Sequence, residues 1–365
     1  MNQPDVKYVS SLYGGFWNFE IKDFCYMTNP YFPPERFVNA LGERLRQMIK
    51  AYPSTNWYIS SLAAEPLGLT HEEVVVANGA SELINAITDS FVDRLVVPVP
   101  TFDEFINRAH ILGKQVSLFR LLPSEDFEVE PERLLRSVQA NGANSVLIIN
   151  PNNPTGKLLS IEKMRLLLES LASLELIVVD ESFNDFVSNP PSPSVMNWLS
   201  DFPNVIVLKS LSKSYGIPGL RLGYAASSNK KRISELRSKL PIWNINSFAQ
   251  YFLETMREYS EDFLVSCTSV RAATNKLYEG LSSVSYLHPY PSEGNYVLSR
   301  ILHSFTGESL TANLFNEFGM LINNMSTKRG LESEEDNFVR MASKTAEENA
   351  ELVRAVQELE ATIAK

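Results

Sequence analysis

Short apolar runs alternate with amphipathic helical patterns through the first two thirds of the chain. The apolar runs predict strands at Val74–Ala77, Leu95–Val99, Val116–Phe119, Ser145–Ile149, Leu176–Val179, Val205–Leu208 and Arg221–Ala225. Helical patterns lie between most of them, at Ser81–Phe91, Phe102–Leu112, Pro131–Ala140 and Ile161–Leu171. This alternation predicts an α/β fold in three layers, with a mostly parallel seven-stranded sheet covered by helices on both faces.

The connections change in the last third of the sequence. The final two predicted strands are joined by a loop with Gly216, Pro218 and Gly219 instead of a helix, which allows one strand to run antiparallel. A long helical stretch, Lys230–Leu281 with a break near Pro241, then leads to an α+β segment and an amphipathic helix, Thr345–Ala364. We therefore expect an N-terminal arm with part of a small domain (1–40), a large domain (41–235) and a C-terminal small domain (236–365).

Composition narrows the class of protein. The chain has 365 residues, of which 44% are apolar and 21% are charged, which is typical of a globular enzyme with room for two cores. A formal net charge of −10 argues against a nucleic-acid partner, which would need a basic face. A small anionic substrate remains compatible, because a few local Arg and Lys residues suffice to bind one.

Metal sites and membrane segments are not predicted. Two cysteines, Cys25 and Cys267, and four scattered histidines show no metal-ligand spacing, so we expect no metal and reduced thiols. The N-terminus is polar, and no apolar run approaches the roughly 18 residues of a membrane span. These features predict a cytoplasmic protein.

Polar residues follow several predicted strands, at the sheet edge where α/β proteins bind ligands. Asn78-Gly79-Ala80-Ser81 follows the first strand and opens a helix, whose N-terminal N–H groups favour an anion. Asp180 ends an apolar strand, where an unpaired carboxylate would be costly to bury. Taken singly, each motif is also typical of an ordinary helix start, turn or strand end.

Two further motifs complete the set. Asn153 lies in the turn Asn150–Gly156, and Lys213 lies between two serines in a segment that reaches Arg221 eight residues later. Together the motifs offer a lysine amine, a buried carboxylate, an amide side chain and an anion site at one sheet edge. Catalysis with pyridoxal 5′-phosphate (PLP) needs this combination of groups.

Three stretches of the sequence also carry a family resemblance. NPNNPTGKLL, VVDESFNDF and SLSKSYGIPGLRLGY resemble fold-type I PLP-dependent enzymes of the class I/II aminotransferase group. The most similar branch contains histidinol-phosphate aminotransferase and threonine-phosphate decarboxylase. The resemblance runs from about Tyr52 to Leu359 and keeps the order and spacing of the family motifs. It implies the PLP-dependent transferase fold of type I.

The resemblance implies roles for individual residues. Lys213 would hold PLP as a Schiff base and shuttle a proton during catalysis, and Asp180 would pair with the pyridine nitrogen. Asn153 would donate a hydrogen bond to the ring oxygen O3′. The cofactor phosphate would be bound by Ala80, Ser81, Ser210, Ser212 and Arg221.

Four other residues are implied by position. Phe102 stands where the family stacks an aromatic ring on PLP, although ordinary core packing is an equal alternative. Tyr52 matches a tyrosine that reaches the phosphate across a subunit interface, which implies a homodimer. Arg340 matches the arginine that binds the substrate α-carboxylate, with a surface arginine as the alternative. Lys344 stands where the decarboxylase-like branch carries a second basic residue.

One position departs from many aminotransferases. They have a tyrosine three residues after the Asp, where its hydroxyl also bonds O3′, and this chain has Phe183. Losing that donor should raise the pKa of the cofactor–lysine linkage. The threonine-phosphate decarboxylase-like branch also tends to have Phe at this position.

Three functions are compatible with these residues. The first is an aminotransferase for a small phosphorylated or otherwise anionic amino compound. The alternative is a decarboxylase of an O-phospho-L-amino acid such as phosphoserine or phosphothreonine. The bond that breaks is the one perpendicular to the cofactor ring, so the outcome depends on where the carboxylate is held. A third hypothesis is a non-catalytic protein that keeps the PLP fold.

Overall fold

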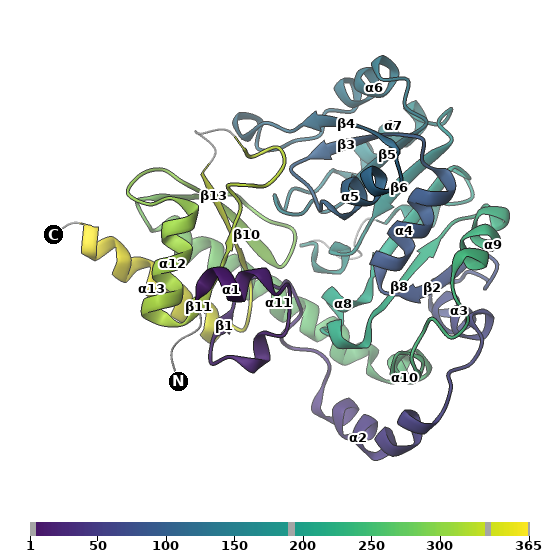
Figure 1. Cartoon of the computed structure of the whole chain (residues 1–365), viewed down its shortest axis with the longest axis horizontal. Coiled ribbons are helices and arrows are strands. Elements are labelled where there is room, and N and C mark those ends of the chain that lie inside the picture. Colours follow the sequence, from purple (N-terminus) through teal and green to yellow (C-terminus); the bar gives the residue numbers. More distant parts are fainter. Residues whose placement is uncertain (1–4, 189–193, 333–336, 364–365) are drawn as a thin grey trace.

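The computed structural model describes residues 5–188, 194–332 and 337–363. Figure 1 shows a larger lobe built on one sheet and a smaller lobe built on another, with the N-terminal segment lying against the smaller lobe. Within the described ranges, no helix combines the length and the apolar character needed to cross a bilayer.

A seven-stranded sheet forms the larger lobe, in the order β2-β8-β7-β6-β5-β3-β4. Its strands are β2 (Val74–Asn78), β3 (Arg94–Val99), β4 (Gln115–Arg120), β5 (Ser145–Ile149), β6 (Leu176–Asp180), β7 (Val205–Ser210) and β8 (Leu222–Ala226). Only β8 pairs antiparallel with its neighbours, β2 and β7. The predicted seven-stranded, mostly parallel sheet is confirmed, and its antiparallel strand is the one that follows the loop after Lys213.

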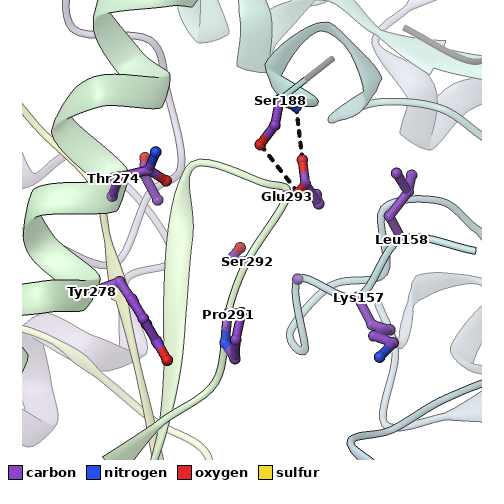
Figure 2. Close-up of a pocket in the computed structure, with 10 residues that line it drawn as sticks. Lys157, Leu158, Ser188, Thr274, Tyr278, Pro291, Ser292 and Glu293 are labelled. Carbon is purple, nitrogen blue, oxygen red and sulfur yellow. Dashed lines mark hydrogen bonds between the residues drawn. The ribbon is translucent and has the colours of Figure 1, made fainter. Parts of the chain in front are cut away.

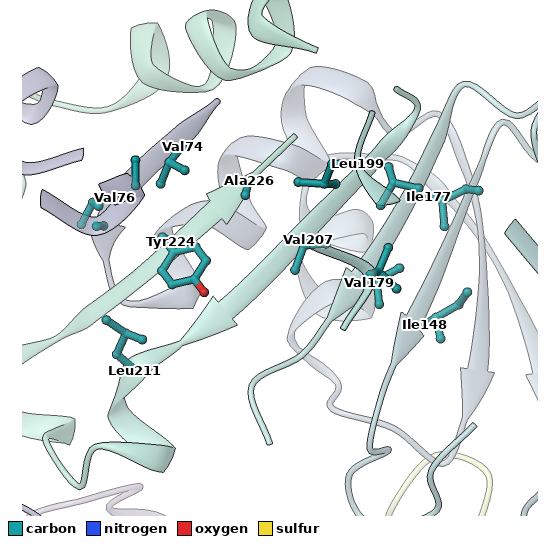
Figure 3. Packing of buried hydrophobic residues seen from close by; sticks show 14 of the residues in the cluster. Val74, Val76, Ile148, Ile177, Val179, Leu199, Val207, Leu211, Tyr224 and Ala226 are labelled. Carbon is teal, nitrogen blue, oxygen red and sulfur yellow. The ribbon is translucent and has the colours of Figure 1, made fainter. Parts of the chain in front are cut away.

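Helices cover both faces of this sheet. Alternate residues of β2 point to opposite sides, Val74 and Val76 into one core and Val75 and Ala77 into the other. Figure 3 shows the first of these cores, in which residues from β2, β8, β7, β6 and β5 pack on one face. The covering helices include α4 (Ala80–Phe91), α5 (Glu104–Ile111), α6 (Pro131–Ala140), α7 (Ile161–Ser170) and α9 (Lys230–Lys239).

The predicted long helical stretch is divided more than once. It contains α9, α10 (Ser247–Thr255) and α11 (Ser260–Ser282), so the break near Pro241 is confirmed and a further one follows α10. The Asn246 side chain caps α10 by accepting a hydrogen bond from the Ala249 N–H at 2.9 Å. The last predicted helix is α13 (Ala346–Ile363).

A four-stranded antiparallel sheet forms the smaller lobe, in the order β12-β13-β10-β9. Its strands are β9 (Leu287–Pro289), β10 (Tyr296–Ile301), β12 (Asn323–Asn324) and β13 (Phe338–Ala342), and α12 (Gly307–Phe318) lies beside them. Short 3₁₀ turns join elements in both lobes: η1 (Phe16–Asn18), η2 (Glu65–Leu67), η3 (Pro123–Glu125), η4 (Asn184–Phe186), η5 (Val195–Trp198), η6 (Pro218–Leu220) and η7 (Met256–Tyr259).

The N-terminal segment belongs spatially with the smaller lobe. Helix α1 (Val6–Ser11) contributes Val9 to a cluster with Phe315, and β1 (Lys22–Asp23) pairs in parallel with β11 (Met320–Leu321). Helices α2 (Glu35–Lys50) and α3 (Asn56–Ala64) instead pack on the larger lobe. The domain boundaries at 40/41 and 235/236 stay predictions.

Candidate active site

The carboxyl edge of the large sheet forms a pocket of about 220 Å³. Nine of the residues predicted for the cofactor line it: Ala80, Ser81, Phe102, Asn153, Asp180, Ser210, Ser212, Lys213 and Arg221. They come from the carboxyl ends of five strands (β2, β3, β5, β6 and β7) and the loops that follow, and from the start of the antiparallel β8, because all of these ends lie at one edge of the sheet. Tyr52, Arg340 and Lys344 are not among the residues that line this pocket.

Lys213 lies on the short helix α8 (Leu211–Ser214), directly after β7. Burial lowers its pKa to about 8, and the positive charges of Arg340 and Arg221 act in the same direction. The nearby Asp180 carboxylate raises the pKa of Lys213, but its effect is smaller than the combined effect of burial and the arginines. At pH 7 a lysine with this pKa is about one tenth neutral, far more than an ordinary lysine, and a nucleophilic amine must be neutral.

Asp180 ends β6 and is buried beneath the pocket. Burial raises its pKa, while hydrogen bonds from Ser182 and the charge of Lys213 lower it. The Ser182 N–H donates to Asp180 Oδ1 at 2.9 Å. A cation placed over the pocket floor would stabilise the carboxylate, as a protonated pyridine nitrogen does.

The opposite end of the pocket is built for an anion. Helix α4 begins here after Gly79, which has φ = 78° and leaves room for the Arg221 guanidinium, since a Cβ at Gly79 would collide with it. Arg221 itself has a left-handed backbone (φ = 56°), an uncommon conformation for a non-glycine residue. Ser212 Oγ is buried with no hydrogen-bond partner in the described part of the chain. The unpaired hydroxyl, the helix N-terminus and the guanidinium would suit a phosphate.

Asn153 connects the two lobes at the site. Its Oδ1 accepts a hydrogen bond from Arg340 Nη1 at 2.7 Å, and Arg340 Nη2 donates to the Cys25 carbonyl oxygen at 2.8 Å. Arg340 is only 7% exposed, within β13, so it is not a surface arginine. The Asn153–Pro154 peptide bond is cis, as is often the case in the family that the sequence resembles.

The remaining predicted residues lie in different surroundings. Phe102 is 42% exposed at the pocket wall, outside both the core and the helix that begins at Glu104. Lys344 Nζ donates to the Tyr26 carbonyl oxygen at 2.9 Å and lies 3.5 Å from Asp23 Oδ2. Tyr52 is 77% exposed and stacks on Trp243, with ring centroids 4.2 Å apart, away from the pocket of its own chain.

Sequence patterns did not reveal the N-terminal contribution. Tyr26 and Met27 line the pocket, although they precede the large sheet by about fifty residues. They arrive there because β1 pairs with β11 of the smaller lobe and carries the chain past Lys213. Phe183 also lines the pocket, with its ring packed edge-on against Tyr296 at 5.1 Å between centroids.

A separate cavity of about 480 Å³ lies between the loop after Asn153 and α11 (Figure 2). Glu293 of the smaller lobe contacts the larger lobe here. Its carboxylate accepts hydrogen bonds from Ser188 N at 2.7 Å and Ser188 Oγ at 3.1 Å. The Glu293 N–H donates to the Gly156 carbonyl oxygen at 2.8 Å. These contacts hold the loop that carries Asn153.

The donor set fits PLP. The pocket brings together an amine, a carboxylate and an anion site, and the carboxamide nitrogen of Asn153 is left for the ring oxygen. Across the described residues, no group of three or more His, Cys, Asp or Glu side chains is arranged to hold a metal ion.

Comparison with known proteins agrees with this geometry. The family model for aminotransferase class I and II matches residues 17–356. The chain belongs to the aminotransferase class I and II family. As a PLP-dependent enzyme of this family, it uses pyridoxal 5′-phosphate as its cofactor.

Two relatives illustrate the range of family members similar to this chain. CMP-5′-(3-aminopropyl)phosphonate synthase of Streptomyces rubellomurinus is 33% identical over 351 residues, which cover 96% of this chain and 55% of that protein. The chain therefore spans about half the length of that relative. L-serine phosphate decarboxylase of Sulfurospirillum multivorans is 31% identical over 362 residues, covering 94% of this chain and 90% of that protein.

Solved structures of the family share the fold. A decarboxylase from Sulfurospirillum multivorans superposes with a TM-score of 0.86 at 29% identity, covering 94% of this chain and 89% of that one. Histidinol-phosphate aminotransferase from Clostridium acetobutylicum gives a TM-score of 0.85 at 26% identity, with coverages of 94% and 100%. The fold-type I architecture predicted from the sequence is confirmed.

Proposed function

We propose that this protein is a PLP-dependent decarboxylase of an α-amino acid that carries a phosphoryl group, of the O-phosphoserine or O-phosphothreonine type. The observation that carries the proposal is the 31% identity to L-serine phosphate decarboxylase along nearly the whole of both chains. The sequence by itself favours transamination, with decarboxylation as the alternative. The comparisons support the second reading better than the first.

Each predicted site residue would have a separate role in binding or catalysis. Lys213 would hold the cofactor and later carry a proton to the substrate Cα, Asp180 would face the ring nitrogen, and Asn153 would donate to O3′. The anion site, made by Ala80, Ser81, Ser210, Ser212 and Arg221, would hold the cofactor phosphate. When bound, the cofactor supplies an electron sink for the pair of electrons left at Cα.

Arg340 would decide which bond is broken. Its guanidinium is buried beside Asn153 and lies outside the pocket lining, but its Nε has no hydrogen-bond partner among the described residues, so one fixed N–H would be left for a substrate anion. A carboxylate held there would lie near the ring plane and leave the α-hydrogen perpendicular, which favours transamination. A phosphoryl group held there would free the carboxylate to take the perpendicular position, which favours loss of CO2. We propose the second arrangement.

Phe183 fits the decarboxylase reading. At this position the threonine-phosphate decarboxylase-like branch tends to have Phe, and the Phe183 ring lines the pocket without a hydroxyl. Asn153 would therefore be the principal side-chain donor to O3′, which changes the electronic properties of the cofactor.

Transamination stays the second candidate. Histidinol-phosphate aminotransferase of Caldanaerobacter subterraneus is 28% identical over 357 residues, so family members with that activity are also similar. We also propose that the enzyme is a homodimer in which Tyr52 serves the partner's cofactor, because Tyr52 is exposed and lies outside the pocket of its own chain. A non-catalytic role would predict bound cofactor without turnover.

The test is a single-turnover comparison on PLP-loaded protein. O-phospho-L-serine, O-phospho-L-threonine, glutamate and histidinol phosphate are mixed in turn with the enzyme, while the cofactor absorbance and CO2 are followed together. The proposal predicts CO2 release with a phosphoamino acid and return of the original absorbance. Conversion to pyridoxamine phosphate without CO2 would instead establish transamination and identify the amino donor.

A further inference from the structure

The cofactor pocket adjoins a larger cavity beneath the N-terminal segment. The larger cavity has a volume of about 780 Å³, and it shares Tyr26, Lys213, Pro218 and Arg221 with the cofactor pocket. Its volume lies within the range of about 300–1,000 Å³ that is typical of small-molecule sites. A substrate joined to the cofactor near Lys213 would therefore have room to extend well beyond a phosphoryl group.

One wall of this cavity is rich in aromatic side chains. Phe16, Trp17, Phe19, Tyr13 and Tyr26 all line it, in a segment of only fourteen residues. Trp17 is 86% exposed and Tyr13 is 88% exposed, so neither ring is used in a core. Exposed aromatic faces beside an active site are suited to stacking on a flat ring of a ligand.

Three charged residues line the cavity, and two of them, Lys213 and Arg221, would be engaged by the cofactor, which leaves the Asp23 carboxylate facing the rest of a ligand. Asp23 lines the cavity, and its Oδ1 accepts hydrogen bonds from the N–H groups of Cys25 at 2.7 Å and Tyr26 at 3.2 Å. Lys344 Nζ lies 3.5 Å from Asp23 Oδ2, so its charge is already partly balanced. A phosphate monoester carries a charge of about −1.5 to −2 at pH 7, whereas a diester keeps only one negative charge. The Asp23 carboxylate therefore repels a diester less strongly.

We propose that this cavity binds a flat aromatic group, such as a nucleobase, which the amino-acid substrate carries through a phosphodiester. The phosphodiester would lie between Arg340 and the cavity, and the ring would stack against Trp17. This inference rests on the proposed function, because it names the substrate class for the same site. It does not depend on which bond at Cα is broken.

The first experiment measures competition by nucleotides. CMP, AMP and ribose 5-phosphate are tested as inhibitors of O-phospho-L-serine turnover by the PLP-loaded enzyme. CMP and AMP should inhibit at least about fivefold more strongly than ribose 5-phosphate, because stacking one base on an aromatic side chain contributes about 1–3 kcal/mol. Trp17→Ala should remove the difference. The matched control is Trp57→Ala, at a 54% exposed tryptophan that lines neither cavity, and it should leave the difference intact.

The second experiment compares two substrates in two enzymes. O-phospho-L-serine and its cytidylyl ester, in which the same phosphate also joins the 5′-oxygen of cytidine, are compared by kcat/KM. The wild-type enzyme should prefer the diester. Asp23→Asn should raise kcat/KM for the monoester relative to the diester, because it removes the repelling carboxylate.

Each outcome bears on the inference separately from the proposed function. Decarboxylation of O-phospho-L-serine with equal inhibition by CMP and ribose 5-phosphate, or with no preference for the diester, would overturn the inference and leave the function standing. Transamination of a preferred diester would overturn the proposed function and leave the inference standing. A Trp17→Ala variant that changes the oligomeric state but keeps the base-dependent difference would show that the aromatic turn is a subunit contact, and would also overturn the inference.

Discussion

Arg340 Nη1 donates a hydrogen bond to Asn153 Oδ1 at 2.7 Å, although the two residues are 187 positions apart in the sequence. Arg340 belongs to the sheet of the smaller lobe, and Asn153 follows β5 of the larger one. Because the carboxamide oxygen is occupied by the guanidinium, the carboxamide nitrogen is the atom available to the cofactor. The bond therefore sets the orientation of Asn153 and the position of Arg340 at once.

This pair should behave as one unit in a double-mutant cycle. Asn153→Ala and Arg340→Ala should each lower kcat/KM, and the double variant should lose less than the sum of the two effects. A hydrogen bond to a charged group is worth about 1.5–3 kcal/mol, so we expect a coupling energy of that size. The control pair is Asn153→Ala with Arg329→Ala, whose effects should add. Additive effects of Asn153→Ala and Arg340→Ala would contradict the assigned orientation.

Covalent loading of PLP should depend on pH through Lys213. Burial and the nearby arginines lower its pKa to about 8, so the amine is protonated below that pH and neutral above it. Only the neutral amine attacks the cofactor aldehyde, so the loading rate of apoprotein should rise through about pH 8 and then level off. Stopped-flow absorbance would measure this profile.

Arg340→Gln should move the loading profile to higher pH, because it removes the strongest of the positive charges that lower the pKa of Lys213. Arg329→Gln serves as the control, since Arg329 is paired with Asp103 at 3.4 Å and is not among the charges that act on Lys213. An unchanged profile for Arg340→Gln would show that these two residues are not electrostatically coupled.

Phe183→Tyr should lower the pKa of the cofactor–lysine linkage. A phenol at this position would donate to O3′ and stabilise the deprotonated form, in which that oxygen carries negative charge. Titration of the cofactor absorbance gives the pKa directly. Phe183→Leu, which adds no donor, should leave the pKa near the wild-type value. Equal pKa values for the tyrosine and leucine variants would mean that the side chain at position 183 does not reach O3′.

A homodimer with shared sites predicts complementation between two defective subunits. Tyr52→Ala weakens the partner's cofactor site, and Lys213→Ala inactivates its own. In a mixed dimer, the site that keeps Lys213 receives an intact Tyr52 from the other subunit, so activity should exceed the sum of the two variants alone. Native mass spectrometry would confirm the mixed species. Full activity in a monomer, or mixing without recovery, would refute the shared site.

Much of the larger lobe follows from local sequence patterns. Strands such as β5 and β6 are continuous apolar runs that end in a polar residue or a turn. This pattern is typical of a buried parallel strand that leads to a ligand site. The same pattern marks Asp180, which ends β6, and Lys213, which comes three residues after the end of β7. The antiparallel direction of β8 follows from the loop that replaces a crossover helix.

Contacts between distant segments could not be predicted in this way. Tyr26 and Asp23 reach the site only because β1 pairs with β11, almost 300 residues later, and two-residue strands leave no periodic signal. The contacts of Lys344 Nζ with Asp23 and with the Tyr26 carbonyl oxygen depend on the same pairing. The sequence could not decide whether Arg340 is buried or exposed for a similar reason, since its burial depends on the contact with the distant Asn153.

The most direct test of the proposed function uses O-phospho-L-serine carrying deuterium at Cα. Decarboxylation breaks the bond from Cα to the carboxylate and keeps the bond to deuterium, whereas transamination breaks the bond to deuterium. Mass spectrometry of the amine product, combined with measurement of CO2, distinguishes the two. Decarboxylation would give one CO2 per turnover and O-phosphoethanolamine that retains the deuterium. A keto product without CO2, with the deuterium lost to solvent, would contradict it.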